Sequence, residues 1–241
     1  KMQDDLGLNP YVKFDKTHKY LSQSHYRIGD SSMFFIANTS LSEHISLKAE
    51  FNVGPDLYPW IWNPESGEKM LYRTKGDQNK LDLELPRATS IIIVFDDNSQ
   101  GEIFQAFDFS KSGMEIPGYW NLQLNHMDGQ REQIELESLV DLILDSKTKN
   151  FAGEVIYEKI IKLDPGKHQF IDLGDVQGVS ELSLNDQLIG TRWYGAHIYD
   201  LKRSIKEGEN KLTIKVTTIT GKYLKGLSDN LVAQNWTRYQ E

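Results

Sequence analysis

Apolar and polar residues alternate along most of the chain, which is the period of a half-buried β-strand. In the segment "HISLKAEFNV", residues 44–53, every second residue from Ile45 onward is apolar and the residues between are polar. The same alternation returns in residues 80–86 ("KLDLELP") and 210–219 ("NKLTIKVTTI"). The apolar run "SIIIVFDD", residues 90–97, instead predicts a strand that is covered on both faces. The pattern therefore predicts an all-β chain of antiparallel strands.

Turn-forming residues divide these strands into two groups. The polar segment "DDNSQGE", residues 96–102, ends the first group, and strands resume at "GYWNLQLNHMDGQ". Tight turns in the second group are marked by Asp128-Gly129, Asp164-Pro165-Gly166 and Asn185-Asp186. Short strands at this spacing are typical of a sandwich or jelly roll. We therefore predict two antiparallel β-sandwich units, residues 1–100 and residues 101–241.

One segment is a helix candidate. In "ELESLVDLILDSK", residues 135–147, apolar residues fall at the i, i+3, i+4 and i+7 positions of a helical face. The segment equally suits a loop with one or two turns, and both alternatives stay open at this point.

Composition excludes several classes of protein. The net charge is −8, with 27 basic residues scattered among 35 acidic ones, so no nucleic-acid partner is expected. The chain has no cysteine, which excludes disulfide scaffolds, thiol nucleophiles and zinc–thiolate sites. The longest apolar run, residues 91–95, is far shorter than the ~20 residues that span a bilayer, so no membrane partner is expected.

Metal and acid–base chemistry have weak signals. The six histidines share no ligand spacing, so no transition-metal site is predicted, whereas a structural calcium stays open because its oxygen ligands leave weak sequence traces. Hydrolysis of a glycoside needs two carboxylates about 5–10 Å apart. Glu154 with Glu158, or Asp172 with Asp175, would supply such a pair. Half-exposed strands supply such pairs by default, so we predict no catalytic residue.

Aromatic residues are the remaining candidates for function, with five Trp and eleven Tyr in the chain. Binding of a sugar needs a ring against its apolar face and polar groups for its hydroxyls. One connection supplies both kinds in Trp193, Tyr194, His197 and Asp200, which we take as the candidate carbohydrate site. The alternative is that Trp193 caps the core of its sandwich or packs against another domain. We favour this alternative and keep the four residues as the candidate site.

Three further tryptophans have an expected position in the fold. Trp120 alternates with Leu122 and Leu124, which indicates a core residue. Trp60 and Trp62 share one face of an extended segment, which suits either a contact between domains or a site.

The second half of the chain resembles the sugar-binding jelly-roll domain of family 2 glycoside hydrolases. The resemblance lies in "GEVIYEKIIKLDPGKHQFIDLGDVQGVSELSLNDQLIGTRWYGAHIYDLKRSIKEGENKLTIKVT". The matching positions are Gly153, Tyr157, Asp172-Leu173-Gly174, Val176, Asn185, Gly190, Trp193, Asp200-Leu201, Gly208, Asn210, Leu212 and Ile214. The upstream segments "HYRIGDSSMFFIANTS", "LYPWIWNPESGEKMLY" and "LDLELPRATSIIIVF" are similar to the region that follows the catalytic barrel in α-L-rhamnosidase-like enzymes of glycoside hydrolase family 106.

These resemblances imply a galactose-binding-like jelly roll for the second unit and a non-catalytic accessory role for the chain. The catalytic carboxylates of that family sit on a barrel that this sequence does not contain, so we expect the carboxyl-terminal end of a longer enzyme. The implied partners are carbohydrate and an upstream catalytic domain of the same polypeptide. The implied location is secreted or periplasmic. The alternatives are a free-standing carbohydrate-binding module and an adhesion domain that binds protein.

Overall fold

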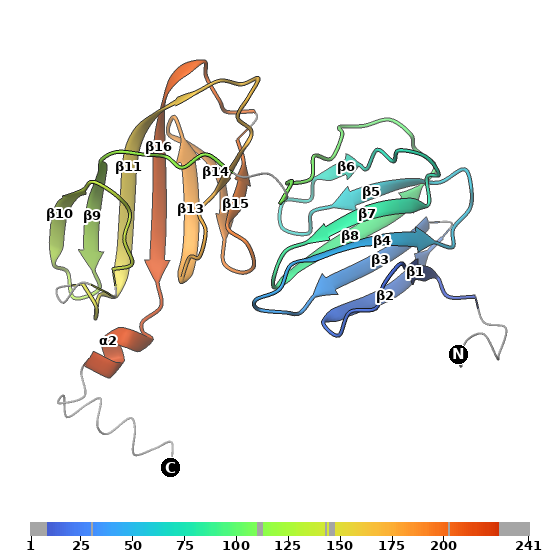
Figure 1. Cartoon of the computed structure of the whole chain (residues 1–241), viewed down its shortest axis with the longest axis horizontal. Helices are drawn as coiled ribbons and strands as arrows, with labels where there is room; N and C mark the ends of the chain where they lie inside the picture. Colours follow the sequence, from blue (N-terminus) through green and yellow to red (C-terminus); the bar gives the residue numbers. More distant parts are fainter. Residues whose placement is uncertain are drawn as a thin grey trace, which may run out of the picture. The chain divides into compact units, whose positions relative to one another are not determined.

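The computed structural model describes residues 9–29, 31–109, 113–142, 144, 148–201 and 203–226. These residues form antiparallel sheets with one short helix among them, so the predicted all-β class is confirmed. The chain divides into two compact units, residues 1–111 and 112–241 (Figure 1). No helix in the described part of the chain is long and apolar enough to cross a membrane.

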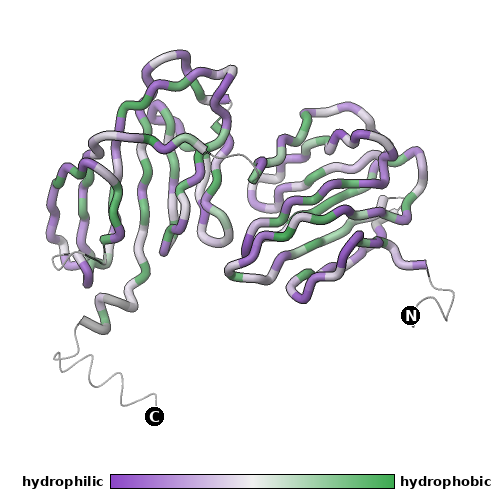
Figure 2. The backbone as a smooth tube through the Cα atoms, in the orientation of Figure 1, coloured by the Kyte–Doolittle hydropathy of each residue, from purple (hydrophilic) through white to green (hydrophobic). Residues whose placement is uncertain are grey.

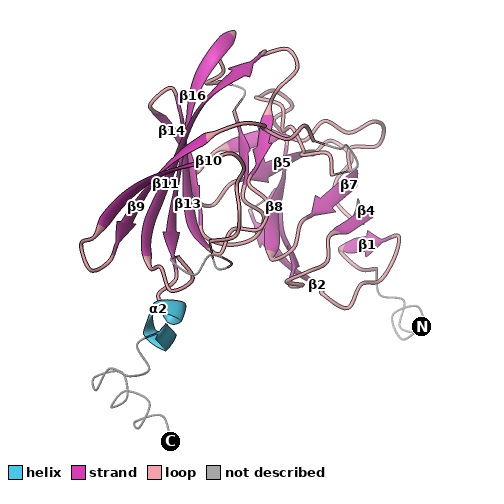
Figure 3. Ribbon diagram, turned by 60° about the vertical axis from the view of Figure 1, so that its left-hand side comes forward, coloured by secondary structure: helices cyan, strands magenta, loops and turns pink. Residues whose placement is uncertain are grey.

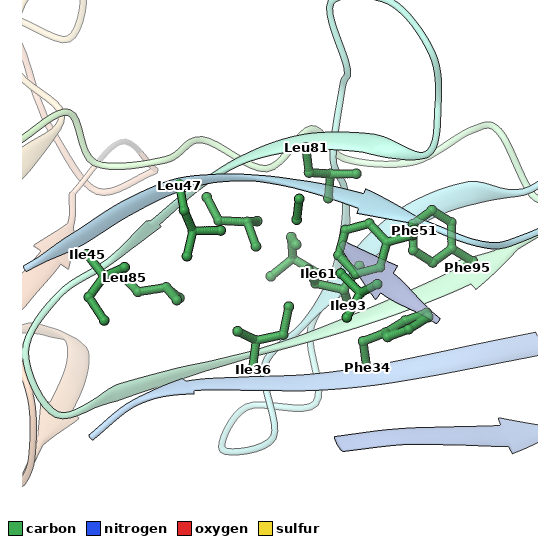
Figure 4. Close-up of a cluster of buried hydrophobic side chains, with 13 residues drawn as sticks. Phe34, Ile36, Ile45, Leu47, Phe51, Ile61, Leu81, Leu85, Ile93 and Phe95 are labelled. Carbon is green, nitrogen blue, oxygen red and sulfur yellow. The ribbon is translucent and has the colours of Figure 1, made fainter. Parts of the chain in front are cut away.

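The first unit is a sandwich of two antiparallel sheets. Its strands are β1 (Val12–Phe14), β2 (Leu21–Ile28), β3 (Ser31–Asn38), β4 (Ile45–Phe51), β5 (Tyr58–Trp62), β6 (Lys69–Leu71), β7 (Lys80–Leu85) and β8 (Thr89–Asp96). One sheet has the order β1-β4-β7 and the other has the order β2-β3-β8-β5-β6. Since both sheets contribute to one cluster of buried apolar residues, the core lies between them (Figure 4).

The core of the first unit follows the predicted alternation. In β4 the burial pattern alternates at every residue, with Ile45 and Phe51 inside and the polar residues outside. Phe51 meets Phe34 of the opposite sheet edge-on at a centroid distance of 4.7 Å, and it meets Phe95 at 5.1 Å. Full burial of such a side chain stabilises the fold by about 1.5–3 kcal/mol. This aromatic cluster therefore joins the two sheets.

The outer face of β5 and β8 is covered as well. Trp60 pairs with Val94 in the ladder, and both residues are buried. The indole Nε1 of Trp60 donates to the carbonyl oxygen of Asn98, 2.9 Å away. A Cβ on Gly101 would fall 2.3 Å from the Trp60 ring, so the chain after β8 lies directly on that ring. Trp60 is thus a core residue of the first unit, and the consecutive burial predicted for residues 90–97 holds from Ile93 to Phe95.

The second unit is built on a six-stranded antiparallel sheet and a two-stranded ribbon. The strands of the larger sheet are labelled in Figure 3. Its elements are β9 (Trp120–His126), β10 (Arg131–Leu136), β11 (Gly153–Leu163), β12 (Phe170–Asp172), β13 (Gly178–Leu184), β14 (Gln187–Arg192), β15 (Ile198–Asp200), β16 (Gly208–Thr218) and α2 (Gly221–Gly226). The sheet order is β10-β9-β11-β16-β13-β14, and the ribbon pairs β12 with β15.

The core of the second unit lies between the sheet and the ribbon. Trp120 and Leu122 of β9 pack in one cluster with Ile171 of β12 and Tyr199 of β15. Trp120 is 3% exposed, which confirms the predicted core position. Along these strands hydrophobic and hydrophilic residues alternate, as Figure 2 shows for the backbone of both units.

The predicted turn between β13 and β14 is present. Asn185 and Asp186 both have positive φ, 54° and 64°, which is the conformation of a two-residue hairpin turn. The Asn185 amide donates to Oδ1 of Asn210, 2.8 Å away, so the turn is tied to β16.

The helix candidate at residues 135–147 does not form a helix in its described part. Leu136 belongs to β10, where it pairs with Trp120 of β9, and residues 137–142 are irregular. Leu139 and Val140 are half exposed instead of facing a core. At Glu135 and Leu136, the pairing with β9 takes the place of helical hydrogen bonds. Ile143 and residues 145–147 lie outside the described residues.

Candidate functional site

Two of the four candidate residues form an exposed aromatic pair. Trp193 and Tyr194 begin the connection from β14 to β15, and Trp193 is 65% exposed. Their ring centroids lie 4.7 Å apart with the planes at 70°, which is the edge-to-face geometry that aromatic pairs prefer. Gly195 follows with a φ of 70°, and it turns the chain back toward β15. Trp193 therefore does not cap the core of the second unit.

His197 lies inside the unit instead of beside the aromatic pair. Its ring is 3% exposed, and its Nδ1 lies 2.6 Å from Oγ of Ser180 in β13. The Ser180 hydroxyl also lies 2.6 Å from the hydroxyl of Tyr199, which donates to the Ser180 carbonyl oxygen at 2.9 Å. Burial raises the pKa of Tyr199, because a phenolate would lose its hydration there. His197 thus belongs to a buried polar cluster.

Asp200 is exposed on β15 and points to the opposite face of the strand from Tyr199. Successive side chains of a strand alternate between faces, and Tyr199 is 1% exposed whereas Asp200 faces solvent. Oδ2 of Asp200 accepts a hydrogen bond from Nε2 of Gln169, 3.1 Å away. The structure therefore brings Trp193 and Tyr194 together at the surface, whereas His197 is buried.

Ser180 and Tyr199 were not among the sequence candidates. Both share the buried cluster with His197. One signal was available in "GVSELSL", where Ser180 occupies an inward position of an alternating strand. A polar residue at such a position needs a buried hydrogen-bond partner.

The carboxylates of β11 lie on the outer face of the sheet and pair with lysines of β16. Glu158 lies 3.0 Å from Nζ of Lys211, and Glu154 lies 3.7 Å from Nζ of Lys215. The hydrogen bonds that the Lys211 ammonium donates to Glu158 and Asp186 raise the pKa of Lys211, because they favour its charged form. The side chains of these ion pairs are partly exposed, and we assign them to the solvated face of the sheet.

Asp172, from the other candidate carboxylate pair, stabilises a turn. Its Oδ1 accepts a hydrogen bond from the backbone N–H of Gly174 at 2.9 Å. Gly174 has a φ of 71°, so the aspartate closes a tight turn after β12.

Metal ligands do not gather in the part of the chain that the structure describes. There, no group of three or more His, Asp or Glu side chains is arranged to hold an ion. A structural calcium, whose ligands would include backbone oxygens, stays a prediction.

The first unit has a shallow groove of about 560 Å³ over the outer face of β1, β4 and β7. Four lysines and four acidic residues line it, and Lys80 pairs with Asp77 at 2.7 Å. The charges of the two signs balance, which indicates a solvated sheet face. The groove is on the first unit, whereas the aromatic pair is on the second.

No family model matches the chain. Among solved structures, the rhamnosidase from Novosphingobium sp. PP1Y matches 95% of this chain with a TM-score of 0.76 and 22% sequence identity. In sequence, the chain is 34% identical over 76 residues to a putative beta-glucuronidase of Formosa agariphila, which covers 30% of this chain. The chain spans only 23% of that rhamnosidase and 6% of that putative glucuronidase. The chain therefore shares the fold of a region of the rhamnosidase, and both likenesses are to glycoside hydrolases.

Proposed function

We propose that this chain is a non-catalytic accessory region of a glycoside hydrolase and that its second unit binds carbohydrate through Trp193 and Tyr194. The observation that supports a binding role is the exposure of the Trp193 ring, which is 65% accessible beside a second aromatic ring. Two exposed aromatic rings in contact offer a contiguous apolar surface to a partner. The shared fold with a rhamnosidase, of which the chain spans 23%, supports the accessory role.

The finer assignments belong to the same proposal. The second unit is a galactose-binding-like jelly roll, and the chain follows the catalytic barrel of an enzyme related to family 106 α-L-rhamnosidases. Its partners are a plant or host glycan and that upstream domain. The protein works outside the cytoplasm, in the secreted or periplasmic space where such glycans occur.

The chemistry of the pair suits a sugar ring. The indole of Trp193 presents an apolar face for the C–H groups of a pyranose, while its N–H and the Tyr194 hydroxyl can serve ring hydroxyls at the rim. Covering about 100 Å² of apolar surface is worth about 2.5 kcal/mol. Loss of the indole should therefore weaken binding by roughly 50-fold or more.

The test is glycan binding by the full chain. We expect the wild type to bind a subset of a glycan array, with affinities then measured by calorimetry, and we expect Trp193→Ala to lose that binding. Tyr119→Ala is the matched control, because Tyr119 is another exposed aromatic residue of the second unit, at 60% exposure. If the wild type binds no glycan, the carbohydrate role is wrong.

A second assay addresses the non-catalytic part. We expect no turnover of 4-nitrophenyl α-L-rhamnoside or 4-nitrophenyl β-D-glucuronide by the isolated chain. Turnover that disappears in Glu154→Gln or Asp172→Asn would overturn the accessory role and place the chemistry on this chain.

A further inference from the structure

We infer that the Ser180 cluster, formed by Ser180, His197 and Tyr199, positions the platform loop, residues 193–197, and holds the Trp193–Tyr194 pair ready for its ligand. We call the Trp193–Tyr194 pair the platform. The inference rests on the proposed function only for the identity of the ligand that the platform binds. The positioning itself follows from the contacts within the second unit.

The Ser180 side chain holds the carboxyl end of the platform loop. Its Oγ lies 2.6 Å from Nδ1 of His197, the last residue of the loop. The same Oγ lies 2.6 Å from the Tyr199 hydroxyl, two residues further along in β15. The carbonyl oxygen of His197 accepts a hydrogen bond from the backbone N–H of Leu173 at 3.1 Å, which adds a contact with the chain after β12. The loop end is therefore bound from two sides.

The backbone of the same serine holds the amino end. In the ladder of β13 and β14, Ser180 pairs directly with Arg192, the residue before Trp193. The Arg192 guanidinium also lies over the ring of Tyr199, 5.5 Å from its centroid, which is within the range of a cation–π contact. One residue of β13 thus joins both ends of a five-residue loop, through its backbone at one end and its hydroxyl at the other.

Burial gives this connection its strength. Ser180, His197 and Tyr199 are 0%, 3% and 1% exposed. Removal of the shared hydroxyl takes a hydrogen-bond partner from two buried polar groups, which costs more than the loss of an exposed hydrogen bond. The loop would then relax, since Gly195 at its centre has wide backbone freedom.

A fixed loop matters for binding because it lowers the entropic cost. A ligand that must first order a mobile aromatic pair loses affinity, whereas a platform held in advance spares that cost. Ser180 is therefore a positioning residue for the platform: it lies beneath the surface and touches no ligand.

The test uses the full chain labelled with 5-fluorotryptophan and observed by ¹⁹F NMR, which needs no ligand. The resonances of Trp193 and Trp120 are assigned by their loss in Trp193→Phe and Trp120→Phe. In Ser180→Ala we expect the Trp193 signal to move toward that of a mobile, solvated indole, while the signal of Trp120 in the core stays in place. Ser183→Ala is the matched control, because Ser183 lies on the same strand but outside the Ser180 cluster.

Two outcomes would overturn the inference. One is an unchanged Trp193 signal in Ser180→Ala, and the other is a joint shift of Trp193 and Trp120, which would mean that Ser180 only stabilises the core. If Ser180→Ala does not fold, Tyr199→Phe removes the contacts of the Tyr199 hydroxyl with Ser180 and leaves the contact between Ser180 and His197 in place. A smaller shift of the Trp193 signal alone is then expected. Tyr157→Phe then serves as its control, because Tyr157 is a partly buried tyrosine that packs against the core of the same unit outside the Ser180 cluster.

A binding measurement separates this inference from the proposed function. With L-rhamnose and D-glucuronic acid as probes, Ser180→Ala should bind about tenfold more weakly than the wild type and Ser183→Ala should be unchanged. If neither sugar binds the wild type while the Trp193 signal still depends on Ser180, the choice of ligand fails and the positioning stands. If a sugar binds and Ser180→Ala changes neither the signal nor the affinity, the positioning fails and the proposed function stands.

Discussion

The two units differ in how they expose a tryptophan: Trp60 lies in the middle of β5 and is buried, whereas Trp193 follows the end of β14 and is exposed. In the first unit the chain after β8 folds over Trp60, and Gly101 lies so close that even one methyl group would collide with the ring. In the second unit Trp193 stays 65% exposed, and the buried residues beneath its loop are polar. The covered ring of Trp60 stabilises its sheet. The ring of Trp193 lies on a loop whose last residue contacts the buried Ser180, and the ring itself is available to a partner. Trp60 is therefore a core residue, and Trp193 is a surface residue.

The largest expected effect is the difference in stability between the variants that truncate the two rings. Trp60→Ala should destabilise the first unit by about 3–5 kcal/mol, because a large buried ring is lost and a cavity remains. Trp193→Ala should change stability by no more than about 0.5 kcal/mol, because an exposed side chain has little packing to lose. Urea unfolding followed by far-UV circular dichroism measures both changes. Equal losses in the two variants would break the comparison.

The close approach at Gly101 predicts a smaller effect. Gly101→Ala places a methyl group 2.3 Å from the Trp60 ring, so the covering chain must move away. We expect a loss of about 1–3 kcal/mol in the same urea experiment. Gly76→Ala is the control, because a Cβ there meets no atom within 4 Å. Gly101→Ala that is as stable as Gly76→Ala would show that Trp60 is loosely covered.

The smallest effect concerns two buried imidazole nitrogens, one in each unit. In the first unit His25 stacks on Tyr11 at 4.0 Å and lies 4.6 Å from Phe34, and its buried Nε2 has no hydrogen-bond partner among the described residues. Burial, and then the nearby Arg27, hold the pKa of His25 below 6.5. In the second unit the Nδ1 of His197 forms a hydrogen bond with the Ser180 hydroxyl.

Since the folded state binds the His25 proton less well than the unfolded chain, His25 contributes stability above pH 6.5 that is lost as the pH falls through its folded pKa. The first unit should therefore lose stability between pH 7.5 and pH 5 partly through this residue. His25→Phe keeps a ring in the stack and removes the titration, so its urea midpoint should depend less on pH than that of the wild type. The same pH dependence in both proteins would contradict this role of His25.

Much of the fold was predictable because strands leave a local signal. The alternation in β4 and in β7 placed Ile45 and Leu83 inside, and both are buried. The turn at Asn185-Asp186 was predictable because two residues with positive φ favour Asn and Asp. The helical alternative for residues 135–147 was wrong in its described part, because apolar spacing says nothing about the partner strand that pairs with Leu136.

The directions of the candidate site residues were not predictable from the sequence. Residue types pointed to one connection with Trp193, Tyr194, His197 and Asp200, but they could not show which side chains point outward. That depends on the pairing of β15 with β12 and on the position of Ser180 in β13. These strands are separated in the sequence, so the direction of His197 follows from hydrogen bonds that form only in the folded unit.

The local pattern of apolar residues, turn formers and aromatic residues is enough to predict an all-β chain and a candidate site at Trp193, Tyr194, His197 and Asp200. Which rings are covered and which stay at the surface is set by long-range contacts: Gly101 over Trp60, and Ser180 beneath the platform loop. The physical reason is that burial depends on the distance between chain segments, and periodicity along one strand reports only the two faces of that strand.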